Sequence, residues 1–155
     1  MVYENAMVLG PDFRFHEGGF AVEHGRFSRV LNVSQGEGID LGGAYVLPGF
    51  IDVHNHGNSG KDFSDGDDEG LKTLARYLAK NGVTSFAPAS VTLPESQLKT
   101  AYESAARFAK TAPAGCAVLR GIHMEGPFFS EKKKGAQNGA YLQNPNYEMF
   151  LRLNE

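Results

Sequence analysis

Residues 47–57 read LPGFIDVHNHG, a short apolar run followed by two histidines spaced two apart. If residues 50–56 form a strand, alternate side chains share one face, which places Asp52, His54 and His56 together. Neutral imidazole is a common ligand of zinc. The stretch therefore predicts a strand whose carboxyl end binds a metal ion through His54 and His56. We expect Asp52 to orient the loop backbone or a histidine ring rather than to bind the ion.

A second candidate stretch is residues 119–128, LRGIHMEGPF, where an apolar run ends at a Gly-Pro pair. Glu125 at the end of this expected strand would add a carboxylate to the two imidazoles, a ligand set that suits zinc, iron or manganese. The alternative for Glu125 is a solvent-facing terminal charge. His123 lies one pair deeper along the strand, and we expect it to be a packed, hydrogen-bonded histidine.

The segments around these two stretches predict alternating strands and helices. Residues 71–79 carry apolar side chains at helical spacing and end at Asn81-Gly82. Residues 83–91 read as a buried parallel strand, and a helix with an apolar stripe over residues 98–109 follows. Thr92 and Glu95 form a candidate capping box for that helix. A third strand is expected from about residue 117 to residue 125, and a last helix opens with Asn144 as N-cap.

This alternation, with candidate ligands at strand ends, predicts an α/β fold that resembles the opening of a (β/α)8 TIM-type barrel. A complete barrel takes about 250 residues, so residues 46–155 would supply about three βα units, an incomplete barrel. Residues 1–45 read instead as short strands at 6–9, 19–23 and 27–33, typical of a small antiparallel sheet or β-sandwich. We therefore expect one domain over residues 1–45 and a second over residues 46–155.

Composition narrows the class of protein. The chain has 155 residues and a formal net charge of −3, and its only basic run is Lys132–Lys134. A net negative charge with so short a basic run argues against nucleic acid as a partner. Cys116 is the only cysteine, which excludes an intramolecular disulfide, and we expect it to be a small core residue. No apolar run reaches the roughly 18 residues of a membrane span. These features predict a cytoplasmic protein with no membrane association.

Several motifs resemble those of the N-acetylglucosamine-6-phosphate deacetylase family, within the amidohydrolase superfamily. They are PGFIDVHNHG at 48–57, NGVTSF at 81–86, and HMEGPF at 123–128 followed by KKGA at 133–136. The resemblance covers nearly the whole chain, and the last pair of motifs is its most specific part. It implies a metal-bearing barrel flanked by a small β-sandwich, of which this chain would be the amino-terminal portion.

The resemblance also implies residue roles and a reaction. Glu125 matches a metal ligand, and His54 with His56 match a pair that binds a second metal in some members, so one or two divalent ions are implied, with zinc as the first choice. Ala136 and Gln137 match positions that contact the amino sugar, although many members have histidine where this chain has Gln137. The implied reaction is hydrolysis of the acetamide of N-acetylglucosamine 6-phosphate to glucosamine 6-phosphate and acetate.

The same resemblance places the general acid/base aspartate, phosphate-binding residues and two further metal histidines beyond Glu155. We therefore expect no catalytic residue in this chain and an inactive isolated fragment. An incomplete barrel also leaves an open parallel edge and uncovered apolar faces, from which we expect a homo-oligomer. Two alternatives stay open. One is another amidohydrolase, of a dihydroorotase-like or D-aminoacylase-like type. The other is a short, non-catalytic binding or assembly protein.

Overall fold

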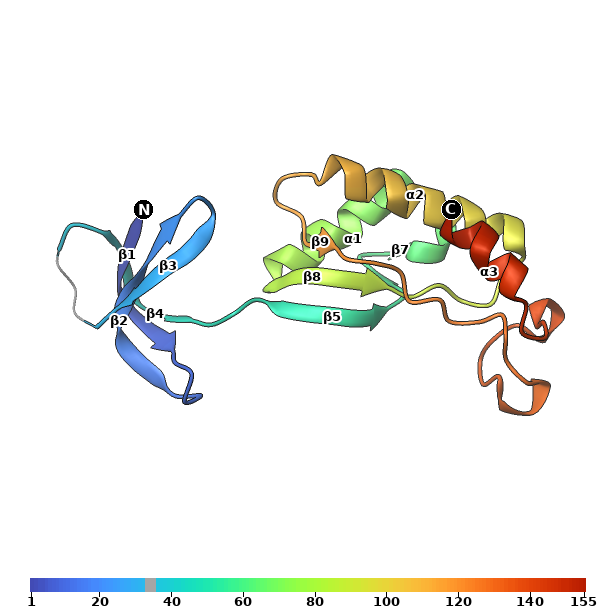
Figure 1. The fold of residues 1–155 in the computed structure, drawn as a ribbon, viewed down its shortest axis with the longest axis horizontal. Helices are drawn as coiled ribbons and strands as arrows, with labels where there is room; N and C mark the ends of the chain where they lie inside the picture. Colours follow the sequence, from blue (N-terminus) through green and yellow to red (C-terminus); the bar gives the residue numbers. More distant parts are fainter. Residues whose placement is uncertain (33–35) are drawn as a thin grey trace. The chain divides into compact units, whose positions relative to one another are not determined.

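The computed structural model describes residues 1–32 and 36–155, and the chain separates into two compact units, Met1–Pro48 and Gly49–Glu155 (Figure 1). The first contains strands only, and the second alternates strands with helices. No helix within the described residues is long and apolar enough to cross a membrane.

The first unit is a four-stranded sheet in the order β3-β2-β1-β4. β1 and β2 pair antiparallel, as do β2 and β3, whereas β4 pairs parallel to β1, so the sheet is mixed rather than antiparallel. The strand predicted over residues 27–33 ends at Val33, which lies outside the described residues. The strands are β1 (Val2–Leu9), β2 (Phe15–Glu23), β3 (Arg26–Leu31) and β4 (Ile39–Val46).

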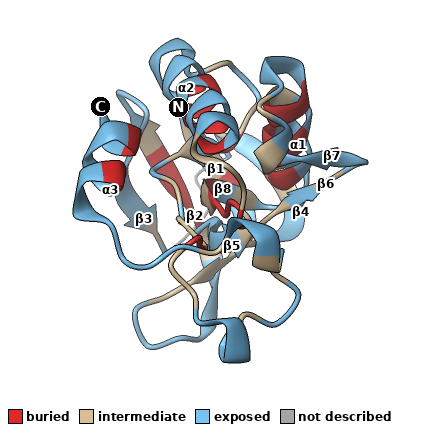
Figure 2. Cartoon of the chain, turned by 90° about the vertical axis from the view of Figure 1, so that its right-hand side faces the viewer, coloured by how far each residue is buried: buried red, intermediate tan, exposed pale blue. Residues whose placement is uncertain are grey.

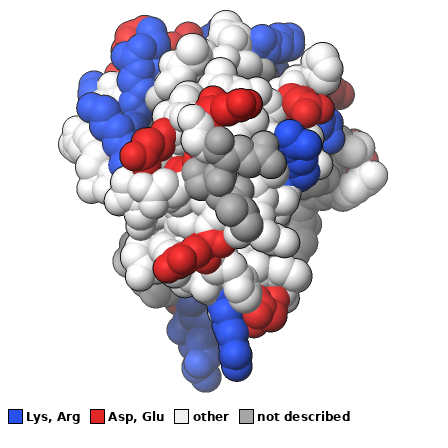
Figure 3. All heavy atoms as spheres, turned by 90° about the vertical axis from the view of Figure 1, so that its left-hand side faces the viewer, with Lys and Arg blue, Asp and Glu red and all other residues white. Residues whose placement is uncertain are grey.

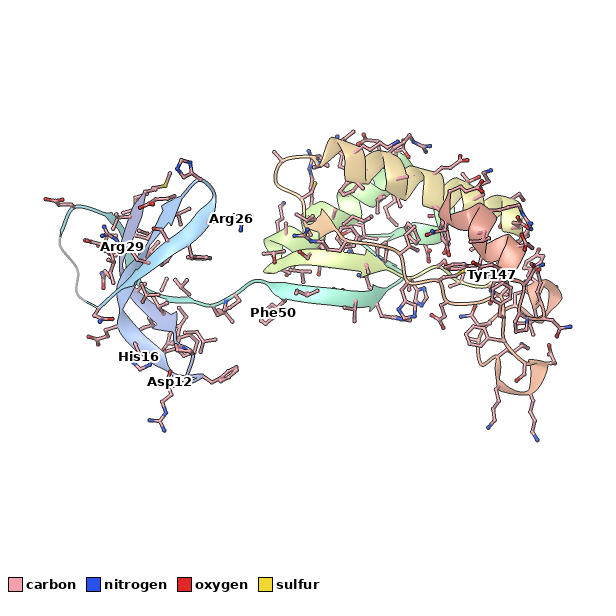
Figure 4. The ribbon with its side chains drawn as sticks, in the orientation of Figure 1. Asp12, His16, Arg26, Arg29, Phe50 and Tyr147 are labelled. Atoms are coloured by element: carbon pink, nitrogen blue, oxygen red, sulfur yellow. The ribbon has the colours of Figure 1, made fainter. Side chains whose placement is uncertain are left out.

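Two turns in this unit show why the strands reverse where they do. His24 and Gly25 form the two-residue connection between β2 and β3, and both have positive φ, as a type I′ hairpin turn requires. Near the start of β2, His16 Nε2 lies 2.9 Å from Oδ1 of Asp12 in the connection from β1, and the two side chains appear together in Figure 4. Figure 3 shows acidic and basic side chains interspersed on one face of the molecule.

The second unit is built on a three-stranded parallel sheet in the order β5-β8-β9. Helix α1 (Asp68–Lys80) connects β5 (Phe50–Asn55) to β8 (Val83–Pro88), and α2 (Glu95–Thr111) connects β8 to β9 (Val118–Leu119). The predicted α/β class is confirmed, and the described residues form no closed barrel. The remaining elements are β6 (Gly57–Asn58), β7 (Lys61–Asp62), the short 3₁₀ helices η1 (Phe63–Asp65), η2 (Glu131–Lys133) and η3 (Gly139–Tyr141), and α3 (Tyr147–Asn154).

The core of this unit lies between the sheet and the two long helices, which cover the same side of the sheet (Figures 1 and 2). Leu74 of α1, Leu98 of α2 and Phe86 of β8 are fully buried there. On β5, by contrast, Phe50 and Val53 are exposed. The amphipathic spacing of α1 and α2 thus fixes both helices on one side of β8.

The helix ends correct two predictions from the sequence. α1 ends as expected, with Asn81 as C-cap and Gly82 at φ +82°. α2 does not use Thr92 as a cap, because Pro94 occupies the N-cap position and Thr92 is buried further back in the chain. α3 starts later than expected, since the Asn146 side chain accepts a hydrogen bond from the backbone N–H of Met149, so Asn146 and not Asn144 is the N-cap.

Two strands are shorter than the apolar pattern predicted. β8 ends at Pro88 instead of Val91, and the third strand is regular only over Val118–Leu119. Beyond Leu119 the chain still runs beside β8. Its backbone pairs there through a single isolated bridge, between Ala89 and His123. Glu125 therefore comes just after the last backbone pairing, at the carboxyl end of the sheet.

Candidate metal centre

His54, His56 and Glu125 converge at the carboxyl end of the sheet, where one ligand atom from each lies within 4.8 Å of the others. Glu125 Oε2 lies 3.2 Å from His54 Nε2 and 3.1 Å from His56 Nε2. His54 lies near the end of β5, His56 directly follows that strand, and the carboxylate comes from the segment beyond β9. Parallel pairing of both strands with β8 brings these two distant parts of the sequence to one edge.

The His56 ring has a defined orientation. Its Nδ1 lies 3.0 Å from the backbone carbonyl oxygen of Ala89, which immediately follows β8. A carbonyl oxygen only accepts hydrogen bonds, so Nδ1 must carry the proton, and a neutral ring then presents the lone pair of Nε2 to Glu125. A hydrogen bond of this kind at the far nitrogen is typical of metal-binding histidines.

The two oxygens of Glu125 have different surroundings. Oε1 accepts a hydrogen bond of 2.9 Å from the Gln137 side-chain amide. Oε2 is buried and, among the described residues, has no hydrogen-bond partner, although the Nε2 atoms of both histidines face it. A buried carboxylate oxygen without a hydrogen bond favours a positive charge beside it. A divalent cation would satisfy all three ligand atoms together, so the residues fit a metal ion.

Asp52 is hydrogen-bonded to the chain segment that carries the two histidines. Its Oδ1 accepts a hydrogen bond of 3.1 Å from the His54 backbone N–H, and its Oδ2 accepts one of 2.8 Å from the Asn55 side chain. Asp52 does not belong to the group of three ligand residues. Its carboxylate therefore fixes the backbone that carries His54, and it does not reach a histidine ring.

His123 differs from its expectation as a packed histidine, because its side chain is exposed. Only the backbone of His123 is paired, through the bridge to Ala89. Its ring meets the ring of His54 edge-on, with 4.5 Å between the centroids. The ring thus borders the site without joining the ligand atoms.

The loop after Glu125 places the two predicted substrate residues differently. Gln137 is half-buried and contacts Glu125, whereas its neighbour Ala136 is exposed. In the basic run, Lys132 and Lys133 are exposed, while Lys134 donates a hydrogen bond of 2.9 Å to the backbone oxygen of Gln137. Lys134 therefore differs from its two exposed neighbours, because its ammonium group is hydrogen-bonded to the loop backbone.

Cys116 lies away from the site and packs against the core of the second unit, with its Sγ 4.0 Å from the Lys72 carbonyl oxygen. Two contributions to the site were missed by sequence reasoning, namely the backbone groups of Ala89 and Thr92. The Thr92 N–H donates a hydrogen bond of 2.6 Å to Gln137 Oε1. Backbone groups carry no side-chain signature, so no residue pattern marks them.

Comparison with known proteins gives consistent matches. The amidohydrolase family profile matches residues 45–150. An N-acetylglucosamine-6-phosphate deacetylase of Vibrio furnissii is 39% identical over 100 residues, which cover 64% of this chain and 25% of the relative. The crystal structure of such a deacetylase from Pasteurella multocida superposes with a TM-score of 0.83 at 27% identity, over 98% of this chain and 41% of that one.

A third match is a variant of the deacetylase from Mycobacterium smegmatis, solved in complex with N-acetyl-D-glucosamine-6-phosphate. It superposes with a TM-score of 0.79 at 22% identity, over 98% of this chain and 39% of that one, and at this identity it supports the fold alone. The chain thus spans between a quarter and about two-fifths of the length of the proteins it matches.

Proposed function

The chain belongs to the amidohydrolase family as a relative of N-acetylglucosamine-6-phosphate deacetylases, and we propose that it forms the amino-terminal part of such an enzyme. The reaction would be hydrolysis of the acetamide of N-acetylglucosamine 6-phosphate to glucosamine 6-phosphate and acetate. The observation that carries the proposal is the buried Glu125 Oε2, which faces the Nε2 atoms of both His54 and His56.

Within this proposal, residues 1–45 begin a small β-sandwich and residues 46–155 begin a (β/α)8 barrel. Active sites of such barrels lie at the carboxyl ends of the strands, which is where the three ligand residues meet. The general acid/base and the phosphate-binding groups would come from the part of the enzyme that these residues do not span. Self-association and a cytoplasmic location remain predictions.

His54, His56 and Glu125 would hold one divalent ion, zinc as the first choice and iron or manganese as the others, and the pair of histidines allows for a second ion. When bound, a divalent ion supplies Lewis acidity for an amide carbonyl and hydroxide near neutral pH. The chain's own groups keep the ligands ready. The Ala89 carbonyl keeps the proton of His56 on Nδ1, and the Gln137 amide donates a hydrogen bond to Glu125 Oε1.

The loop that carries Gln137 is the proposed wall of the substrate site. Its polar groups lie beside the carboxylate, and the exposed Ala136 next to Gln137 leaves room for a bulky ligand such as an amino sugar. We place the acetamide end of the substrate nearest the three ligands. The 6-phosphate would then point toward groups outside these residues.

The test measures acetate release from N-acetylglucosamine 6-phosphate by the complete gene product and by this chain alone, each supplied with zinc. We expect turnover by the complete protein, and bound metal without turnover for the 155-residue chain. Non-phosphorylated N-acetylglucosamine, dihydroorotate and an N-acyl-D-amino acid serve as comparison substrates. A complete protein that prefers one of the last two would overturn the assignment.

A further inference from the structure

We propose that Gln137 is a positioning residue, whose side-chain amide holds Glu125 so that one carboxylate oxygen faces the two histidines. The proposal rests on the proposed metal site and adds a residue that acts on it through Glu125. Gln137 lies in the loop between η2 and η3, and its side chain reaches back to the carboxyl ends of the strands.

The orientation of the amide is determined by its partner on the other side. The backbone N–H of Thr92 donates to it at 2.6 Å, and since an N–H only donates, the atom at that position must be the oxygen Oε1. The nitrogen Nε2 then faces Glu125 Oε1 at 2.9 Å. A flipped amide would set donor against donor and acceptor against acceptor, so only one orientation is stable.

This arrangement leaves the carboxylate charge available. The amide is neutral, so it fixes Oε1 of Glu125 without offsetting the charge that a cation would need. Lys134 of the same loop donates to the backbone oxygen of Gln137 at 2.9 Å. Oε2 stays buried with both imidazoles before it.

The support for Gln137 is rigid. Thr92 is 1% exposed, and Ala89 and Ser90 are fully buried. The Ser90 hydroxyl lies 3.0 Å from the Tyr102 hydroxyl of α2, which ties this segment to the helix core. Residues 89–92 therefore position two ligands, His56 through the Ala89 carbonyl and Glu125 through Thr92 and Gln137, although β8 itself supplies none.

The experiment measures the Kd for Zn²⁺ by competition with a chelating dye, using the full chain. In Gln137→Leu, which is similar in size but lacks both hydrogen bonds, we expect binding to weaken by about 10- to 100-fold. Gln143→Leu makes the same change at an exposed position between η3 and α3 and should keep the wild-type Kd. Gln137→His should recover most of the affinity, because a neutral imidazole has one donor and one acceptor.

The outcomes separate the two proposals. If the folded wild-type chain binds no Zn²⁺, the metal site itself is wrong. If the wild type binds and Gln137→Leu binds equally well, the site stands and the positioning role is overturned. Should the leucine variant fail to fold, Gln137→Asn keeps the amide but is one methylene too short for both contacts, and wild-type affinity there would likewise overturn the role. Absorption of bound Co²⁺, unchanged in Gln143→Leu and altered in Gln137→Leu, gives a second readout.

Discussion

Asp68, the first residue of α1, accepts hydrogen bonds of 2.8 and 3.0 Å from the Arg107 guanidinium of α2. Ser104 adds a third at 2.6 Å. The Arg107 contact and then the Ser104 hydroxyl lower the pKa of Asp68 from 3.8 to about 2. These contacts join the two helices that cover the sheet. The free energy of unfolding should therefore depend on the ionisation of this carboxylate, and so on pH.

The sign of that link follows from the lowered pKa. The ionised carboxylate stabilises the folded state above pH 3.8, and this contribution is lost as the pH falls toward 2. We expect Asp68→Asn to lower the free energy of unfolding at pH 7, and its difference from the wild type to shrink as the pH falls through about 2. Urea unfolding across this range measures it, with Glu69→Gln as the exposed neighbouring control. A deficit that persists unchanged at pH 2 would contradict the assignment.

Glu125→Gln tests the carboxylate ligand with an isosteric change. The variant keeps the shape but loses the negative charge at Oε2, so stoichiometric metal should no longer survive dialysis. Elemental analysis of the dialysed protein measures the metal content. Glu131→Gln makes the same change at an exposed residue of η2 and should retain metal. Equal metal in both variants would remove Glu125 from the site.

Gly126→Ala should disturb the site through the backbone. Gly126 has φ +84°, and a Cβ there would lie 2.1 Å from Oγ1 of the buried Thr92. Gly135→Ala is the matched control, with φ +60° and nothing within 4 Å of its Cβ. Both variants bear a conformational cost of about 1–2 kcal/mol. Only Gly126→Ala adds the clash, so its Tm should fall further than that of Gly135→Ala and its metal binding should weaken. Equal Tm values for the two variants would show that the Thr92 side chain moves aside without cost.

Leu98→Ala tests the helix core that holds the sheet. Leu98 is fully buried on α2, and its truncation should cost about 2–5 kcal/mol in the free energy of unfolding. Lys99→Ala, at the exposed next position, should change stability by no more than about 0.5 kcal/mol. Chemical denaturation measures both. A cost for Leu98→Ala as small as that of the control would mean that this core is not formed.

The sequence predicted the features that depend on local pattern. Apolar spacing of 3.6 located both long helices, and Asn81-Gly82 marked the end of the first. The strand-end histidines and Glu125 were predicted to meet, and their ligand atoms lie within 4.8 Å of one another. These predictions worked because periodicity and the common direction of parallel strands require no knowledge of distant contacts.

Features that depend on distant partners were missed or wrong. The parallel pairing of β4 with β1 has no local signal, and apolar residues after Pro88 and Leu119 do not reveal where pairing stops. Asn144 and Asn146 flank the same proline, and only the hydrogen bond to Met149 distinguishes the cap. For Gln137, the residue type did not show that its amide bridges Thr92 and Glu125.

The backbone supports of residues 89–92 have a consequence for how this region varies among relatives. Every residue has a carbonyl, and every residue except proline has an N–H, so small side chains could replace one another there without removing either support. A one-residue insertion or deletion would move the Ala89 carbonyl and the Thr92 N–H away from their partners. His56 and Glu125 would then lose their orientation together. We therefore expect this stretch to preserve its length more strictly than its composition.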